Sequence, residues 1–313
     1  MRSLMNRVNG AGYTALLNSV ADDAFAQLQR LRDMAGTAHR LAPHSNTAVL
    51  IHAFNSTGSA TAQEQGYDRN AWGGQLIVEQ QVHEKLCLGL ALANGQTRIT
   101  PAGDNEHTDT ATHLSVYALY SDEEWRLLLA AGMGMHEFSL SRRLADGTDC
   151  EVEGAAGSSV NFCMEISREF TLDSSSSLCP YLALQSTTAW VDSFSESGSS
   201  AALLAGEQQA TLTELSIGTR YRTTLAESLQ LGLHAALTAT FGDTETGLDM
   251  RFAGAPEHSF RVTSDERDTL GTRTGLTLAL PLSPAATLHT ATNLHLQSNF
   301  HYLDTQFGII LHF

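Results

Sequence analysis

Thirteen histidines are the side chains in this sequence most able to bind a metal or to move a proton near neutral pH. His289 and His295 share one face of a predicted strand, and His234 lies on another strand. A metal site would need further ligands at a recognisable spacing, such as HExxH or paired His and Cys residues. Neither pattern accompanies these histidines, and no carboxylate cluster does. The sequence therefore predicts no metal site and no cofactor.

Nucleophilic side chains show no catalytic arrangement either. The serines fall mainly in turns and loops, without a G-x-S-x-G elbow or a distinctive Ser/His/Asp set, so we predict no catalytic residues. Cys87, Cys150, Cys163 and Cys179 lack the CxxC spacing of a zinc or redox site. Cys163 and Cys179 flank one short turn and form a disulfide if the register brings them face to face. The alternative is that all the cysteines are buried free thiols.

Composition limits the partners of the chain. Its 313 residues carry a net charge of −16, whereas a nucleic-acid backbone needs a basic surface, so nucleic acid is excluded as a partner. No apolar run approaches the roughly 18 residues of a transmembrane helix. The start, "MRSLMNRVNG", lacks the hydrophobic region of a signal peptide. Either the protein is not exported, or the chain is a fragment whose leader lies upstream.

The first 45 residues differ in pattern from the rest of the chain. The stretch "GYTALLNSVADDAFAQLQRLRDMAG" is rich in Ala, Leu, Gln and Arg and contains no Pro. Its apolar residues recur every three or four positions, which predicts one amphipathic helix over about 13–35, ended by Pro43. The chain thus divides into a segment of residues 1–45 and a domain of residues 46–313. The apolar positions of the helix are Leu17, Val20, Ala24, Leu28 and Leu31.

From about residue 47 onward, apolar residues alternate with small or polar ones, which is the period of a β-strand. In "LCLGLALANG", the leucines face one way and Cys87, Gly89, Ala91 and Ala93 face the other. The segments are long, about ten to fourteen residues, where an average strand has five or six. The twelve predicted strands are 47–56, 69–82, 86–98, 111–121, 125–140, 157–170, 178–191, 210–222, 228–242, 269–282, 286–299 and 303–313.

The connections between these segments alternate in length. Short ones, such as "HEK", "DEE", "TLAE" and "SPA", alternate with long polar ones, except at the last hairpin. Barrels of the outer membrane have short periplasmic turns and long external loops, and closure leaves no backbone group unpaired in lipid. The sequence therefore predicts an all-β fold: a 12-stranded antiparallel up-and-down transmembrane β-barrel. The alternative, a soluble β-sandwich, would have shorter strands and less regular loops.

Several stretches, taken in order, resemble the C-terminal translocator β-barrel of autotransporters (type V secretion). The resemblance covers about residues 47–313, and the predicted helix occupies the place of the linker helix of that family. The chain departs from the family in lacking a Trp at the start of the first strand and in its four cysteines. The stretches are "YDRNAWGGQLIVEQQVHEKLCLGLALANGQTRI", "THLSVYALYSDEEWRLLLAAGMG", "LCPYLALQ" and "RFAGAPEHSFRVTSDERDTLGTRTGLTLAL".

The resemblance implies a pore and anchor in the outer membrane of a Gram-negative bacterium, through which an upstream passenger reaches the cell surface. It also implies a periplasmic C-terminus and recognition by the outer-membrane barrel assembly machinery and periplasmic chaperones. The family's assembly signal is a terminal Phe preceded by alternating apolar residues. In this chain those residues are Phe307, Ile309, Leu311 and Phe313.

The resemblance further places the helix in the lumen of the barrel. A helix is about 10–12 Å across with its side chains, so it needs small residues on the wall beside it. The alternative is that Gly and Ala merely relieve strand curvature. The inward small residues are Gly89, Ala91, Ala93, Ala130, Gly132, Gly134, Gly232, Ala236 and Gly275. Asp22, Asp23, Arg30, Arg32 and Asp33 of the helix are expected to pair with Arg126, Glu165, Glu214, Arg220 and Arg273 of the wall.

Some members of that family cut their own linker at an asparagine, for which Asn6, Asn9 and Asn18 are the candidates. The "VNG" sequence is a turn signal and is interpreted as the turn before the helix, so self-cleavage is not supported. Two other functions stay open: a free-standing channel for small solutes and a barrel-embedded hydrolase. A passenger upstream of Met1 would exclude the channel. Loss of hydrolysis on replacing one Ser, His or Asp would establish the hydrolase.

Overall fold

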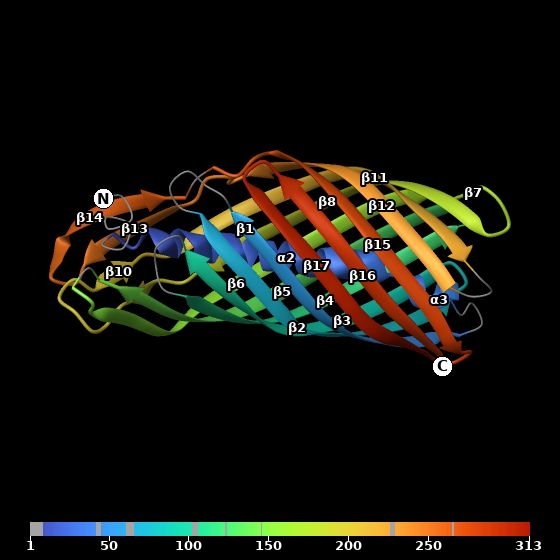
Figure 1. Ribbon diagram of the computed structural model, residues 1–313, viewed down its shortest axis with the longest axis horizontal. Coiled ribbons are helices and arrows are strands. Elements are labelled where there is room, and N and C mark those ends of the chain that lie inside the picture. Colours follow the sequence, from blue (N-terminus) through green and yellow to red (C-terminus); the bar gives the residue numbers. More distant parts are fainter. Residues whose placement is uncertain are drawn as a thin grey trace.

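Long antiparallel strands wrap into a closed barrel around one helix in the computed structural model (Figure 1). The residues that the structure describes are 9–41, 45–60, 66–101, 106–122, 124–144, 146–225, 229–264 and 266–313.

The barrel consists of twelve long strands. Each strand pairs with its neighbour in the chain, β1 pairs with β17, and β8 pairs with β11, so that no edge is left open. The strands are β1 (Thr47–Ala60), β2 (Tyr67–His83), β3 (Leu86–Pro101), β4 (His107–Asp122), β5 (Trp125–Arg143), β6 (Asp149–Arg168), β8 (Ser176–Val191), β11 (Gln208–Leu225), β12 (Leu229–Gly242), β15 (Leu270–Ser283), β16 (Ala286–Gln297) and β17 (Phe300–His312). All twelve predicted strands are present, which confirms the predicted fold.

Several strands extend further toward the long loops than the sequence pattern indicates. The strand predicted at 157–170 is β6, which begins at Asp149. Its extra residues continue the pairing with β5 past a register shift between Phe138 and Ser139. Backbone pairing extends a strand even where its side chains no longer alternate, so hydropathy underestimates its length.

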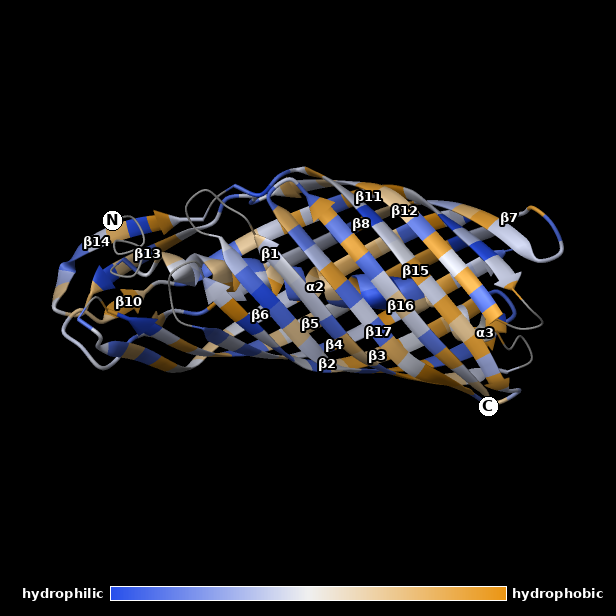
Figure 2. Ribbon diagram, in the orientation of Figure 1, coloured by the Kyte–Doolittle hydropathy of each residue, from blue (hydrophilic) through white to orange (hydrophobic). Residues whose placement is uncertain are grey.

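The two faces of the barrel wall differ as the alternation predicts. Hydrophobic and hydrophilic residues alternate along the strands of the barrel (Figure 2). Outward side chains are apolar and exposed, for example Leu90 at 49%, Met133 at 53% and Leu237 at 63%. The residues between them, such as Ala91 and Ala130, are buried. No helix in the described part of the chain is long and apolar enough to cross a membrane. The outward apolar band therefore provides the surface that lipid tails would cover.

The helical segment runs inside the barrel, from the end with the long loops to the end with the short turns (Figure 1). It starts as a single turn of 3-10 helix, η1 (Ala11–Tyr13), and continues as α2 (Thr14–Met34). This agrees with the helix predicted over 13–35. A short helix, α3 (Thr37–Leu41), was not predicted, and it follows a turn at Gly36, whose φ is 69°.

A second sheet at the long-loop end corrects the sequence analysis, which interpreted its residues as loops. Its strands lie in the order β14-β13-β10-β9. Alternation in "GLDMRF" and "SFRVT" was a usable signal, but β9 and β10 are too short to show a period. We name this sheet the cap sheet; it consists of β9 (Phe194–Ser195), β10 (Leu203–Ala205), β13 (Gly247–Phe252) and β14 (Ala255–Thr263).

Candidate functional site: the helix in the lumen

Helix α2 is buried on nearly every side, not only along its predicted apolar face. Leu17, Val20, Ala24, Leu28 and Leu31 are at most 1% exposed, as their spacing predicts. The charged residues of the helix are nearly as buried: Asp22, Asp23, Arg30 and Arg32 are all below 8% exposed. A helix enclosed by a polar lumen meets the wall all round, so its polar face needs charged partners there.

Two arginines of the helix pair with carboxylates on opposite parts of the wall. Arg32 lies 3.0 Å from Glu165 on β6, which also accepts two hydrogen bonds from Arg220, at 2.6 and 2.7 Å. Arg30 donates to Asp304 on β17, with Nη2 2.6 Å from the carboxylate. Glu165 and Arg220 belong to the predicted set of wall residues, whereas Asp304 does not. Its inward position on the last predicted strand was the signal that could have found it.

Two aspartates of the helix have partners that the sequence analysis missed. Asp22 accepts a hydrogen bond from Arg267 at 2.7 Å, and Asp23 forms an ion pair with Arg69. The alternation of its predicted strand places Arg69 on the face toward the lumen. Arg267 lies in a stretch interpreted as loop, so no sequence signal placed it near the helix.

The remaining predicted wall residues reach the helix indirectly or not at all. Arg273 pairs with Glu214 at 3.0 Å and donates to Gln29 of the helix at 2.8 Å. Arg126 lies against Gly36, where the helix turns, and makes no ion pair with any other described residue. Asp33 accepts hydrogen bonds from Gln29 and Asn293, at 2.8 and 3.1 Å, rather than from an arginine.

The predicted small residues all lie on the inward face of the wall. Most of the glycines make room for the side chain of a neighbouring wall residue and not for the helix directly. A side chain at Gly89 would overlap the ring of Tyr117, and one at Gly275 would overlap His234, because each ring lies across the glycine. Gly132, Gly134 and Gly232 similarly lie under Ser115, His113 and Thr277. Ala91 and Ala130 share a buried cluster with Leu28 and Leu31 of the helix. That the set as a whole makes room for the helix stays a prediction.

Two carboxylates and a histidine meet where Asp23 of the helix reaches the wall. Ligand atoms of Asp23, Asp109 and His136 lie within 4.8 Å of one another, a spacing that could hold a metal ion. Each of the three side chains also has a protein partner: Arg69 pairs with Asp23, Thr97 donates to it at 3.0 Å, and His136 Nδ1 lies 2.8 Å from Asp109. The predicted absence of a metal stays a prediction, and His289 and His295 are not part of this group.

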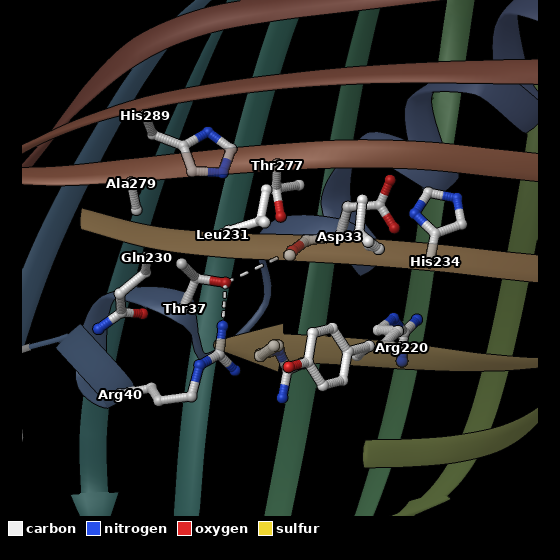
Figure 3. A pocket seen from close by; sticks show the side chains of 14 residues that line it. Asp33, Thr37, Arg40, Arg220, Gln230, Leu231, His234, Thr277, Ala279 and His289 are labelled. Atoms are coloured by element: carbon white, nitrogen blue, oxygen red, sulfur yellow. Dashed lines mark hydrogen bonds between the residues drawn. The ribbon is translucent and has the colours of Figure 1, made fainter. Parts of the chain in front are cut away.

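The lumen is less tightly filled at the short-turn end of the helix. A cavity of about 60 Å³ lies between the helix end and β12, β15 and β16, with Asp33, His234 and His289 around it (Figure 3). Arg40 donates to Thr37 there, at 2.9 Å. A larger cavity of about 660 Å³ opens beside Arg126 and Lys85. The helix therefore contacts the wall along its whole length, and open space remains beside its last turn.

The sequence of the barrel matches the autotransporter beta-domain family over residues 49–293. The chain belongs to that family. Its members lie in the outer membrane of Gram-negative bacteria, and the barrel is the unit that anchors and exports an upstream passenger. No curated protein matches the chain.

Three solved autotransporter structures are similar to this barrel. The translocator domain of NalP from Neisseria meningitidis has a TM-score of 0.78 at 12% identity, covering 96% of this chain and 99% of that one. The β-domain of the Bordetella autotransporter BrkA has a TM-score of 0.63 at 15% identity, covering 86% and 100%. The transport unit of AIDA-I from Escherichia coli has a TM-score of 0.56 at 11% identity, covering 86% and 90%. At such low identities the likeness establishes the fold.

Cys163 and Cys179 do not form a disulfide in this autotransporter barrel, because the strand register does not bring them face to face. All four are buried and free. Cys163 lies opposite Gln185, and Cys179 lies opposite Arg220 on a different strand. Cys179 is six positions from the residue that faces Cys163, or about 20 Å along the strand, far beyond the reach of a disulfide.

Of the asparagines considered for self-cleavage of the linker, two lie in the described part. Asn9 Oδ1 accepts a hydrogen bond from the amide of Ala11 at 3.1 Å, and Gly10 has a φ of 66°. This is the turn that "VNG" predicts. Asn18 lies within α2, and Asn6 is outside the described residues.

Proposed function

We propose that α2 is the linker of an exported passenger, held in the lumen with its first residues toward the cell surface and with Phe313 on the periplasmic side. The observation that supports this is the direction of the helix: Tyr13 lies at the long-loop end and α3 at the short-turn end. Short turns are periplasmic in barrels of this kind. Any chain joined to the first residues then emerges outside the cell.

In this proposal residues 1–45 are the linker segment and residues 46–313 are the translocator domain. The ion pairs of Arg30 and Arg32 keep the linker in place after export, because removing a buried charge from its partner costs several kcal/mol. A porin-like channel for solutes would need an open lumen.

Conductance in a planar bilayer tests the proposal. The full chain is compared with a chain that begins at residue 45, and the expected result is low conductance that rises sharply when the helix is removed. An epitope placed before Asn9 is expected to bind antibody on intact cells. Equal, open conductance from both chains would move the assignment to a solute channel.

We also propose that Phe307, Ile309, Leu311 and Phe313 form the signal read by the barrel assembly machinery, after delivery by periplasmic chaperones. Phe307 and Phe313 point outward, 57% and 70% exposed. The backbone of Phe313 pairs with Thr47, so the terminal residue also closes the barrel. Phe313→Ala keeps those backbone bonds and removes the ring. Loss of assembly in cells, with refolding in detergent unchanged, is expected; failure in both assays would assign the ring a structural role instead.

We propose no hydrolytic activity and no self-cleavage. The supporting observation is that the Asn9 side chain is oriented toward the amide of Ala11, which donates to its Oδ1 in the turn before the helix. The mass of the purified chain is expected to stay constant on incubation. A product cut after Asn9 or Asn18 would contradict this.

A further inference from the structure

We propose that the cap sheet, together with the outer ends of β5 and β6, is a binding site for the chain's own linker at Gly10–Tyr13, and that filling this site closes the outer mouth of the pore. The inference deepens the proposed function and rests on it in one respect, namely that the linker reaches the site at the end of export. The ion pairs of Arg30 and Arg32 hold the helix within the barrel. The site proposed here lies at the long-loop end of the barrel and binds a different segment, Gly10–Tyr13.

A buried polar network joins the linker to the cap sheet. Tyr13 donates its hydroxyl to Glu196 Oε1 at 2.5 Å, and Glu196 lies between β9 and β10. Arg142 of β5 donates to both oxygens of Glu196, at 2.7 and 2.5 Å, and the amide of Leu203 donates to Oε2 at 2.7 Å. The side chains of Arg142 and Glu196 are both 0% exposed. The carboxylate thus connects three separate segments: the linker, the barrel wall and the cap sheet.

The turn before the helix fits the cap sheet sterically. Gly10 has a φ of 66°, which favours glycine, and a Cβ there would lie 2.5 Å from Leu203 Cδ1 and 3.2 Å from Met250 Sδ. Leu203 is fully buried on β10, and Met250 is 1% exposed on β13. The Asn-Gly pair of the sequence is therefore not only a turn signal. It lets the linker backbone approach two strands of the cap sheet.

The Tyr13 ring forms the centre of the contact. It packs edge-on against Phe194 of β9, with ring centroids 5.2 Å apart, and stacks on His107 of β4 at 5.3 Å. Tyr13 itself is 0% exposed. Around it, one buried cluster combines linker and cap-sheet residues: Ala11, Tyr13, Leu16, Leu17, Phe194, Leu203, Ala205, Leu248, Met250 and Val262.

The cap sheet depends on the linker for its apolar core. Strands β9 and β10 have two and three residues, less than an isolated sheet needs for stability. Their inward residues pack on the linker. Without Gly10–Tyr13, the ion pair of Arg142 and Glu196 would therefore be uncovered. This fit is to Gly10–Tyr13, so in the proposal the cap sheet closes when that segment arrives.

Cys150 offers a native reporter of closure. It is 0% exposed, lies opposite Arg142 in the β5–β6 pairing, and the next residue, Glu151, bridges to Ser197 of the cap region. We would use a full-length chain with Cys87→Ala, Cys163→Ala and Cys179→Ala, so that Cys150 is the only thiol. The rate of labelling by a charged, membrane-impermeant maleimide on refolded barrels then measures how often the cap sheet opens.

Tyr13→Ala and Gly10→Val are expected to raise the labelling rate of Cys150 roughly a hundredfold, because each removes or blocks the packing of the linker in the site. Arg143→Met is the control, since Arg143 is adjacent to Arg142 but forms an exposed pair with Asp149. Labelling as slow as in the parent for both Tyr13→Ala and Gly10→Val would overturn the proposal.

Conductance of the same variants separates this inference from the proposed function. With α2 still in place, Tyr13→Ala is expected to raise conductance only slightly, while removal of residues 1–44 opens the pore. Unchanged conductance after that removal would refute the proposal that the linker closes the lumen, without touching the Cys150 result. Unchanged Cys150 labelling in the two variants would refute the linker site without touching the conductance result.

Discussion

The two ends of the lumen are closed in different ways. At the long-loop end, Tyr13, Arg142 and Glu196 form a network that water does not reach. At the short-turn end, a cavity of about 660 Å³ opens beside Arg126, and neither Arg126 nor Arg40 has a carboxylate partner among the described residues. A buried polar network fills the long-loop end, whereas at the short-turn end the packed end of the helix leaves a cavity beside it.

This difference indicates where the seal must be specific. In the export proposed above, the linker fills the long-loop end only when export is complete, so contacts that recognise its sequence would be useful there. At the short-turn end the chain turns at Gly36 from α2 into α3, beside a cavity lined by Arg40 and Arg126. A buried ion pair is costly to break, whereas an exposed one contributes about 0–1 kcal/mol to stability.

Arg142→Met is expected to have the largest effect, at the outer end. It leaves Glu196 buried with only the Tyr13 hydroxyl and the Leu203 amide, which should lower the free energy of local opening by about 3–5 kcal/mol. Hydrogen exchange of the Leu203 amide measures that opening.

Arg143→Met is its matched control, because Arg143 makes the same two-pronged contact with Asp149 but is 56% exposed. Little change is expected there. Comparable acceleration of Leu203 exchange in both variants would show that the outer end is not a dry, cooperative unit.

Tyr117→Phe tests the inner end. Glu79 accepts hydrogen bonds from the Tyr117 hydroxyl at 2.5 Å and from the amide of Gly36 at 2.7 Å, which fixes the turn after α2. Losing one hydrogen bond to a charged group should cost about 1.5–3 kcal/mol in a urea titration of the refolded barrel. Tyr120→Phe, on the same strand but pointing outward, is the control and should be neutral. A larger loss of free energy in Tyr117→Phe than in Arg142→Met would show that the short-turn end is held more strongly than the long-loop end.

Gly89→Ala tests how the wall accommodates the inner half of the helix. A methyl group there would displace the Tyr117 ring from its place across the glycine, so a loss of about 1–3 kcal/mol is expected. Gly74→Ala on the neighbouring strand is the control, since its Cβ would meet only the His52 carbonyl oxygen, at 3.5 Å. If both variants unfold at the same urea concentration, the glycines relieve strand curvature rather than seat side chains.

The barrel was predictable from sequence because its physics is local and repeated. Each strand, such as Leu86–Pro101, shows which face meets lipid in its own alternation, and loop lengths set the order.

The lumen partners were only partly predictable. Parity places Arg69 and Asp304 inward, but which helix residue each meets depends on the rotation and depth of the helix, which no local pattern contains.

The cap sheet could not be predicted for a related reason. Its strands come from two loops far apart in the sequence, and two of them are too short to show a period. Glu196 lies in a serine-rich stretch that is typical of a loop. Only the three-dimensional meeting of Tyr13, Arg142 and Glu196 identifies the site.

The smallest expected effect lies on the inner rim, in the turn between β7 (Phe170–Thr171) and β8. Asp173 accepts hydrogen bonds from the Ser176 hydroxyl at 2.5 Å and from the amide and hydroxyl of Ser175, at 2.7 and 2.8 Å. These bonds, that of Ser176 foremost, favour the charged carboxylate and lower the pKa of Asp173 to about 2. A carboxyl with a lowered pKa stabilises the folded turn above its unfolded pKa of about 4, and that contribution is lost as the pH falls toward 2.

The turn should therefore loosen between about pH 4 and pH 2. The chemical shifts of Ser175 and Ser176 amides follow the turn, and the Leu203 amide follows the outer end. Asp173→Asn should abolish the pH dependence of the turn. A change at the Leu203 amide that Asp173→Asn abolishes would mean that the two closures are coupled through the helix, and the contrast between them would then describe one cooperative plug rather than two separate devices.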